Sequence, residues 1–277
     1  MLYSSPDEWL RYLEAIHPSG IDLGLERVAH VAETLDCVKP APLVILIGGT
    51  NGKGTTSALI AALLRKQGKR VGMYNSPHIH RYNERVSVDG SDISDSDLCL
   101  SFEAVEEARG DTTLTYFEFG TLAALWHFRQ QSLDAVVLEI GLGGRLDAVN
   151  VVDPDISVVT SIGLDHQDWL GDTLDDIAYE KCSIARKGKW LVCGQPDAPG
   201  RASATVENIG GRFSARGDMF DVAESEQQLI VSYATKSGSS TVTLSDYHIP
   251  HHNVATAIQS LALIDLLPSP EEVSEVV

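Results

Sequence analysis

Short, mainly apolar runs alternate along the chain with longer segments in which apolar residues recur every three or four positions. The short runs are typical of strands buried on both faces of a parallel sheet, and they cover 43–47, 70–74, 134–140, 155–162 and 190–194. The longer segments predict helices over 7–17, 21–37, 55–68, 97–109, 117–131, 174–186 and 251–267. This alternation predicts an α/β fold with a doubly wound, mostly parallel sheet.

Beyond about residue 212 the pattern changes to short strands joined by Gly/Ser turns, and it continues so to about residue 247. We expect this segment to form a small antiparallel appendage within one domain that spans residues 1–267. The stretch 268–277 begins another helix.

A glycine-rich loop, IGGTNGKGTT, follows the first predicted strand at residues 47–56 and leads into a predicted helix. Its form departs from G-x-x-x-x-G-K-[ST], because the first glycine comes one position late and Gly54 follows Lys53. Loop amides and a helix N-terminus bind phosphate, and Lys53 adds positive charge. The alternative is a tight strand-to-helix turn that simply needs glycine. The setting favours a phosphate site, with Thr55 or Thr56 as a possible hydroxyl ligand of Mg²⁺.

Polar residues follow the other predicted strands: Ser76 after the second, Glu139 and the 141–150 loop at the third, and Asp165-His166 after the fourth. Ligands of open α/β sheets bind outside the carboxyl ends of the strands, so we expect these side chains to meet. Oxygen ligands with an occasional imidazole suit Mg²⁺ or Mn²⁺. Taken singly, each has an ordinary alternative, such as a solvated carboxylate, a hydrogen-bonded loop histidine or a turn.

Composition and charge restrict the partners. The 277-residue chain has a formal net charge of −18, which argues against nucleic acid and anionic membranes as main partners. It contains no run of about 18 apolar residues that could span a membrane. The four cysteines form no C-x-x-C pair, which favours a reduced, cytoplasmic setting.

Six ordered motifs resemble those of the folylpolyglutamate synthase/dihydrofolate synthase family, which belongs to the Mur ligase superfamily. They are GTNGKGTT, YNSPHIHRYNERVSV, LTYFEFGTLAAL, VVLEIGLGGRLDAVN, VVTSIGLDHQDWLG and IAYEKCSIARKG. The similarity extends from about residue 20 to about residue 260 and is greatest to the bacterial bifunctional members. It implies a P-loop domain similar to the Mur ligase central domain.

The resemblance implies roles for individual residues around ATP and magnesium. The ATP-binding residues would be Thr50, Asn51, Gly52, Lys53, Gly54 and Thr55 in the loop, with Asn253 at the adenine. The metal ligands would be Ser76, Glu139 and His166, together with Lys181 carrying a carbamate derived from CO₂. Lys53, Lys181 and His166 form the implied catalytic set. Without the resemblance, Lys181 would be interpreted as a solvated helix lysine.

The resemblance also implies a pterin pocket made from three segments. These are Asp22, Leu23, Gly24 and Leu25; Thr115, Tyr116, Phe117 and Glu118; and Leu146, Asp147 and Ala148. An aromatic side chain such as Phe117 suits stacking on a flat heterocycle. Burial statistics are equally consistent with a core aromatic at this position.

The implied activity is an ATP-dependent amide ligase of folate biosynthesis that works through an acyl phosphate. It would join L-glutamate to dihydropteroate, giving dihydrofolate, and to tetrahydrofolate polyglutamate tails. Family members continue into a second lobe that helps bind ATP and glutamate, so we expect 268–277 to begin a linker to a lobe that this chain lacks. The alternatives are a truncated, non-catalytic ATP- and pterin-binding lobe, a Mur-type peptide ligase, and a phosphate-loop kinase or GTPase. We expect a monomer.

Overall fold

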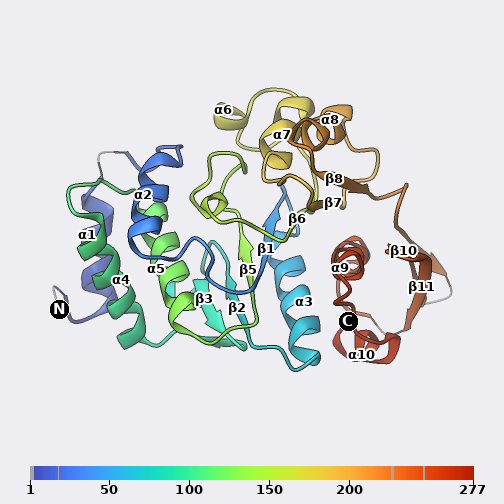
Figure 1. The fold of residues 1–277 in the computed structure, drawn as a ribbon, viewed down its shortest axis with the longest axis horizontal. Helices are drawn as coiled ribbons and strands as arrows, with labels where there is room; N and C mark the ends of the chain where they lie inside the picture. The colour runs from blue at the N-terminus through green and yellow to red at the C-terminus, as the bar shows by residue number, and fades with distance from the viewer. Residues whose placement is uncertain (1–2, 18, 226–227, 246) are drawn as a thin grey trace.

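A computed structural model describes residues 3–17, 19–225, 228–245 and 247–277 (Figure 1). Its centre is an eight-stranded sheet in the order β4-β3-β2-β5-β1-β6-β7-β8. The strands are β1 (Leu43–Gly48), β2 (Val71–Tyr74), β3 (Val86–Val88), β4 (Ser91–Asp92), β5 (Ala135–Glu139), β6 (Ile156–Val159), β7 (Trp190–Cys193) and β8 (Arg212–Ala215). Six neighbouring strands, β2, β5, β1, β6, β7 and β8, are parallel. Strand β3 pairs antiparallel with β2 and with β4. The expected mostly parallel sheet is confirmed.

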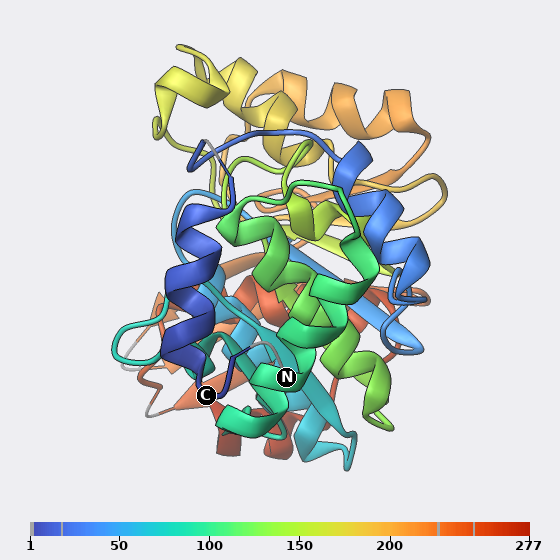
Figure 2. The same cartoon turned by 90° about the vertical axis from the view of Figure 1, so that its left-hand side faces the viewer.

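Helices cover both faces of this sheet, as a doubly wound fold requires. Successive residues of β1 face opposite cores: Val44 and Leu46 pack on one side, and Ile45 and Ile47 on the other. The first core contains residues of α1 (Pro6–Ala15), α2 (Glu26–Thr34), α4 (Asp95–Arg109), α5 (Tyr116–Gln130), α7 (Leu174–Cys182) and α8 (Gly200–Ile209). The second contains residues of α3 (Lys53–Lys66), α9 (His251–Leu263) and α10 (Pro270–Val276). Figure 2 shows the helices of the first group from the N-terminal half, in blue and green, in front of the sheet.

The small antiparallel region is shorter than expected at its start. It consists of β9 (Asp221–Ser225), β10 (Gln228–Thr235) and β11 (Gly238–Ser245), with β10 in the middle. The prediction that residues 212–215 belong to it is wrong, because β8 pairs parallel with β7 at the edge of the main sheet. A parallel neighbour requires a crossover connection, which the unpredicted helix α8 provides.

Two further boundaries differ from the sequence expectation. The helix expected over 21–37 begins only at Glu26, and the residues before it run as an irregular segment. Arg27 holds that segment, since its Nη2 donates to the carbonyl of Asp22 and its Nη1 lies 2.8 Å from the Asp22 carboxylate. The strand expected over 155–162 ends at Val159 and leaves 160–163 as a loop beside the glycine loop.

Near the end of the chain, α10 forms as expected and packs its buried Val273 into the second core. Glu275 of this helix also pairs with Lys66 of α3. The assignment of 268–277 as a linker stays a prediction. Across the described ranges, every helix is too short or too polar to cross a membrane.

Candidate active site

The backbone of the glycine loop requires glycine at positions 49 and 52. Gly49 and Gly52 have φ angles of +138° and +83°, a region that favours glycine. A Cβ at Gly49 would lie 2.0 Å from Thr160 Oγ1, and one at Gly52 would lie 2.6 Å from Asn253 Oδ1. The loop is therefore pressed between the 160–163 segment and the first turn of α9.

Hydrogen bonds from two sides fix the backbone of the loop. Lys53 Nζ donates to the carbonyls of Gly49 and Thr50 at 3.0 and 3.2 Å, so its ammonium group folds back over the loop. Thr160 Oγ1 donates to the Asn51 carbonyl at 2.7 Å, and Asn51 N donates to Ser161 Oγ at 2.9 Å. The lysine charge, the turn and the start of α3 thus lie together, as an anion site requires.

Glu139 lies beside the start of α3. It ends β5 level with Ile47, and its Oε2 accepts a hydrogen bond from Ser76 N at 3.2 Å. A Cβ at Gly54 would lie 3.7 Å from the same oxygen, so the carboxylate faces the position where a standard loop carries its Ser or Thr. Burial raises the pKa of Glu139, against the opposing effects of Ser76 N and Lys53. A buried carboxylate of this kind is stabilised by a nearby cation.

His166 and Lys181 lie on the 163–182 segment. His166 precedes α6 (Gln167–Leu170), has a left-handed backbone, and places Nε2 3.6 Å from Asp165 Oδ2. Lys181 on α7 is only 3% exposed. Burial, and then the charge of Lys53, lower its pKa to about 8, while Asp165 and Asp147 act in the opposite direction. Its amine is therefore partly neutral near physiological pH.

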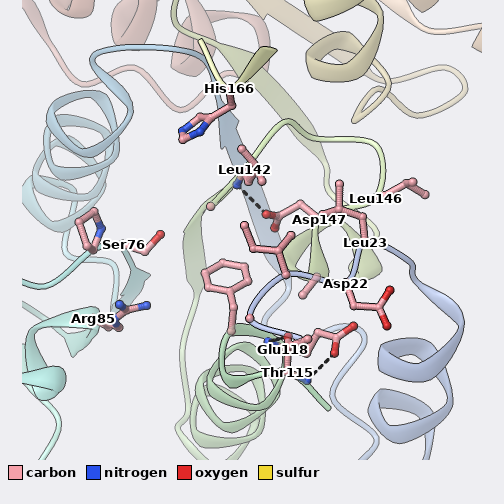
Figure 3. Close-up of a pocket in the computed structure, with 16 residues that line it drawn as sticks. Asp22, Leu23, Ser76, Arg85, Thr115, Glu118, Leu142, Leu146, Asp147 and His166 are labelled. Atoms are coloured by element: carbon pink, nitrogen blue, oxygen red, sulfur yellow. Dashed lines mark hydrogen bonds between the residues drawn. The ribbon is translucent and has the colours of Figure 1, made fainter. Parts of the chain in front are cut away.

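A cavity of about 340 Å³ lies next to this group of residues (Figure 3). All three predicted pterin segments line it. The predicted residues at its wall are Asp22, Leu23, Thr115, Phe117, Glu118, Leu146, Asp147 and Ala148, together with Ser76 and His166. Gly24, Leu25 and Tyr116 are not part of the lining. Figure 3 shows Ser76 and Arg85 on one side of the space and Asp22, Leu146 and Asp147 on the other.

The wall at the start of α5 is held rigidly. Thr115 and Glu118 form a capping box, in which Thr115 N donates to Glu118 Oε2 at 2.7 Å and Glu118 N donates to Thr115 Oγ1 at 3.2 Å. Glu118 Oε1 accepts a hydrogen bond from Arg27 at 2.8 Å. Both carboxylate oxygens of Glu118 are thus engaged, which fixes this side chain in the cavity wall.

Asp147 presents a buried carboxylate at the opposite wall. It caps the short helix η2 (Ala148–Val151): Oδ1 accepts from Val149 N at 2.9 Å, and Oδ2 accepts from Leu142 N at 2.8 Å. Burial raises the pKa of Asp147 to about 6, although these backbone donors lower it. The group can therefore accept hydrogen bonds from a polar ligand in an otherwise largely apolar cavity.

Phe117 lies at the boundary between the core and the cavity. Its ring is half-buried and packs against Gly141, where a Cβ would lie 2.5 Å from Phe117 Cζ. The absence of a side chain at Gly141 thus leaves room for the ring. The sequence left a core role and a cavity role open, and Phe117 contributes to both.

Sequence reasoning missed Arg85, which closes the wall beside Ser76. It ends the short helix η1 (Tyr82–Arg85), and its Nε donates to His78 Nδ1 at 2.9 Å. Its guanidinium carbon lies 5.1 and 5.9 Å from the ring centroids of Tyr82 and Tyr116. A single arginine within YNERVSV carries no spacing signal that could have identified it.

Comparisons with known proteins identify the family of this chain. A family model described as the Mur ligase middle domain matches residues 47–193, more than half of the chain. The Escherichia coli (strain K12) dihydrofolate synthase/folylpolyglutamate synthase is 46% identical over 253 residues, covering 91% of this chain and 59% of that protein. Fold and loop thus define a Mur ligase domain.

Two solved structures are also similar. An E. coli FolC in complex with DHPP and ADP is 43% identical with a TM-score of 0.95, covering 99% of this chain and 66% of that one. A Yersinia pestis bifunctional folylpolyglutamate synthase/dihydrofolate synthase with AMPPNP and Mn is 43% identical with a TM-score of 0.92, with the same coverage. The chain belongs to the dihydrofolate synthase/folylpolyglutamate synthase family of Mur ligases. It spans about three-fifths of the length of the E. coli relative.

Proposed function

We propose that the chain provides the nucleotide and pterin sites of an ATP-dependent ligase that joins L-glutamate to a pterin-linked carboxylate. The observation that carries this proposal is the link between cavity and loop. Ser76 lines the cavity, its amide donates to Glu139, and Glu139 faces the first turn of α3 behind Lys53. A substrate carboxylate in the cavity would thus lie close to the phosphates of a nucleotide on the loop.

The loop residues from Thr50 to Thr55 hold the phosphates in this proposal. The loop amides and Lys53 neutralise phosphate charge, and the contact of Asn253 with Gly52 supports a place for Asn253 at the nucleotide. ATP supplies a phosphoryl group to the substrate carboxylate, and the amino group of L-glutamate attacks the resulting acyl phosphate to give an amide, ADP and phosphate. The protein contributes position and charge, which are the main factors in phosphoryl transfer.

Ser76, Glu139 and His166 would hold Mg²⁺ or Mn²⁺. The raised pKa of the buried Glu139 carboxyl and its position beside Lys53 and Ser76 fit a cation-binding carboxylate. The described residues contain no cluster of three or more His, Cys, Asp or Glu side chains placed to hold a metal. Magnesium usually keeps several waters and is bound through one or two carboxylates and substrate phosphates, so Glu139 and the nucleotide would supply most of its ligands besides water. Such an ion would neutralise the phosphate charge.

Lys181 would carry the CO₂-derived carbamate. Carbamate formation requires a neutral amine, which attacks CO₂ and releases a proton. The lowered pKa of Lys181 supplies that neutral form. A carbamate would also replace the repulsion between Lys181 and Lys53 by attraction, and would provide oxygen ligands for a second metal ion.

Dihydropteroate and tetrahydrofolate polyglutamates are the proposed pterin substrates. Phe117 would stack on the ring, and Asp147 would accept hydrogen bonds from its N–H groups. Asp22, Leu23, Thr115, Leu146 and Ala148 would complete the walls. A monomer in the cytoplasm remains our expectation.

Glutamate-dependent ADP release tests the proposal. The full chain with Mg²⁺, ATP, L-glutamate and dihydropteroate should release ADP only when all four are present. Binding of ADP and dihydropteroate without turnover would support a non-catalytic binding lobe in place of a complete ligase. Stimulation by a UDP-muramyl peptide and none by dihydropteroate would show that the assigned substrate is wrong.

A further inference from the structure

Residues 19–25, which we call the strap, run as an irregular segment ahead of α2 and form one wall of the substrate cavity. The residues of the strap that line the cavity are Gly20, Ile21, Asp22 and Leu23. Figure 3 shows Asp22 and Leu23 above Glu118, which belongs to the start of α5. Movement of the strap away from α5 would therefore widen the cavity.

Few tertiary contacts hold the strap in place. Its apolar side chains, Ile21, Leu23 and Leu25, belong to neither of the two hydrophobic cores among the described residues. Within the same part of the chain, the backbone of residues 20–25 makes no hydrogen bond to the sheet or to α5. Local bonds remain, such as the one from Ser19 Oγ to the Ile21 carbonyl at 2.6 Å. A segment with so little buried apolar area and so few hydrogen bonds opens at a low cost in free energy.

Arg27 ties the strap to the body of the protein. Its Nη1 lies 2.8 Å from Asp22 Oδ2, and its Nη2 donates to the Asp22 carbonyl at 3.1 Å. The same Nη2 donates to Glu118 Oε1 at 2.8 Å. His17 adds only a contact of 3.7 Å between its Nε2 and Asp22 Oδ2. The guanidinium thus joins a carboxylate of the strap that is 42% exposed to a carboxylate of α5 that is 5% exposed and fixed by its capping bonds.

We propose that Arg27 is a positioning residue that latches the strap and sets the rate at which substrate enters and leaves the cavity. The inference rests on the proposed function, because it takes the cavity to hold a pterin substrate. Arg27 can bond to Asp22 and Glu118 at once because its N–H donors form a rigid fork, which a lysine lacks. When these bonds break, the strap keeps only its local contacts and the cavity opens. Loss of the latch should therefore speed both entry and exit, whereas loss of a direct ligand contact would speed exit alone.

Thiol labelling followed by mass spectrometry measures opening of the cavity without a ligand. Ala148→Cys places a thiol in the cavity wall, where Ala148 is only 4% exposed, and the four native cysteines are buried. We expect iodoacetamide to label position 148 of the full chain at least about tenfold faster when Arg27→Met is added, because charge-assisted hydrogen bonds are lost. Arg129→Met is the matched control and should leave this rate unchanged. Arg129 bonds to the carbonyl and the carboxylate of Asp36 in the same way, but it lies outside the cavity.

The native cysteines distinguish opening of the strap from unfolding. An unchanged labelling rate at position 148 would overturn the latch. If Arg27→Met also speeds labelling of the native cysteines, the whole fold opens, and Asp22→Asn decides. It removes the exposed carboxylate of the latch and leaves Glu118 paired with Arg27. Asp22→Asn should speed labelling at position 148 alone by about two- to fivefold, as for an exposed charge pair, and no change would overturn the latch.

Stopped-flow binding of dihydropteroate to the full chain separates the latch from a direct ligand contact and from the proposed function. Arg27→Met should raise the association and dissociation rates together by about tenfold, and Arg27→Lys should restore part of the slow exchange. A rise in the dissociation rate alone would show that Arg27 contacts the ligand and would overturn the latch. If dihydropteroate binds and neither rate depends on Arg27, the latch is wrong and the pterin site stands. If dihydropteroate does not bind while labelling at position 148 depends on Arg27, the latch stands and the assigned substrate is wrong.

Discussion

Replacing Gly141 by alanine tests the role of Phe117 with a single added methyl group. The backbone at Gly141 is compatible with alanine, so the effect comes from the side chain alone. The new Cβ would lie 2.5 Å from Phe117 Cζ, which is about 1 Å closer than a normal carbon–carbon contact. The ring must therefore move, and the open cavity in front of it gives it space to do so.

This movement should affect ligand binding more than folding. Overpacking of a closed core costs about 1–3 kcal/mol, but the half-buried ring can shift into the cavity, so we expect a loss of unfolding free energy below about 1 kcal/mol. The displaced ring takes up pterin space and loses its stacking geometry, which is worth about 0.5–1.5 kcal/mol. Dihydropteroate should then bind about tenfold more weakly, equivalent to about 1.4 kcal/mol.

Titration calorimetry with dihydropteroate and Mg-ADP measures the affinity, and urea unfolding measures the stability. Gly20→Ala is the matched control, because Gly20 also lines the cavity but its Cβ would meet nothing within 4 Å. ADP affinity should be unchanged in both variants. Wild-type dihydropteroate affinity in a folded Gly141→Ala variant would refute the stacking role, as would an equal loss in Gly20→Ala.

Three other changes probe the loop and the buried lysine. Lys53→Ala should weaken ATP binding about 10- to 100-fold by calorimetry, whereas Lys66→Ala on the same helix should not; equal affinities would remove Lys53 from the phosphate site. Gly52→Ala should lower the unfolding free energy by about 1–3 kcal/mol, because residue 52 has a left-handed φ and a Cβ there would contact Asn253. Gly54→Ala should not destabilise the fold, because a Cβ there would meet only Glu139 Oε2, at 3.7 Å. Since burial lowers the pKa of Lys181 to about 8 from 10.5, the unfolded chain binds more protons at this residue between these values, and Lys181 contributes a rise in stability with pH of up to about 3 kcal/mol across this window. Buried groups with raised pKa values, such as Tyr74 and Cys193, act in the opposite direction in both proteins, so the rise should be seen in the difference in unfolding free energy between wild type and Lys181→Met, measured from pH 7 to pH 10.

Features of the fold that depend on local sequence pattern and on strand direction could be predicted from the sequence. The apolar runs identified the central strands because a strand buried on both faces has few polar positions. Parallel strands bring their carboxyl ends to one edge, which is why Ser76, Glu139 and His166 were expected to approach the glycine loop. The resemblance then pointed to three distant segments that prove to line one cavity.

The remaining features depend on tertiary contacts. Helix α8 buries only small side chains, Ala202, Thr205 and Val206, and it has no side-chain cap, so its sequence signal is weak. Without that helix, β8 could not be recognised as a parallel strand. The engagement of both Glu118 oxygens depends on Arg27, which lies 91 residues away in the sequence. Arg85 likewise reaches the cavity only through the turn that follows Ser76.

A crystal structure of the full chain with ADP, Mg²⁺ and dihydropteroate tests the central claim most directly. We expect the phosphates on the 49–54 loop, the metal beside Glu139 and Ser76, and the pterin ring against Phe117 with its polar edge at Asp147. The substrate carboxylate should point toward Lys53. A pterin bound outside this cavity, or phosphates away from the loop while the cavity holds the pterin, would contradict the proposed site.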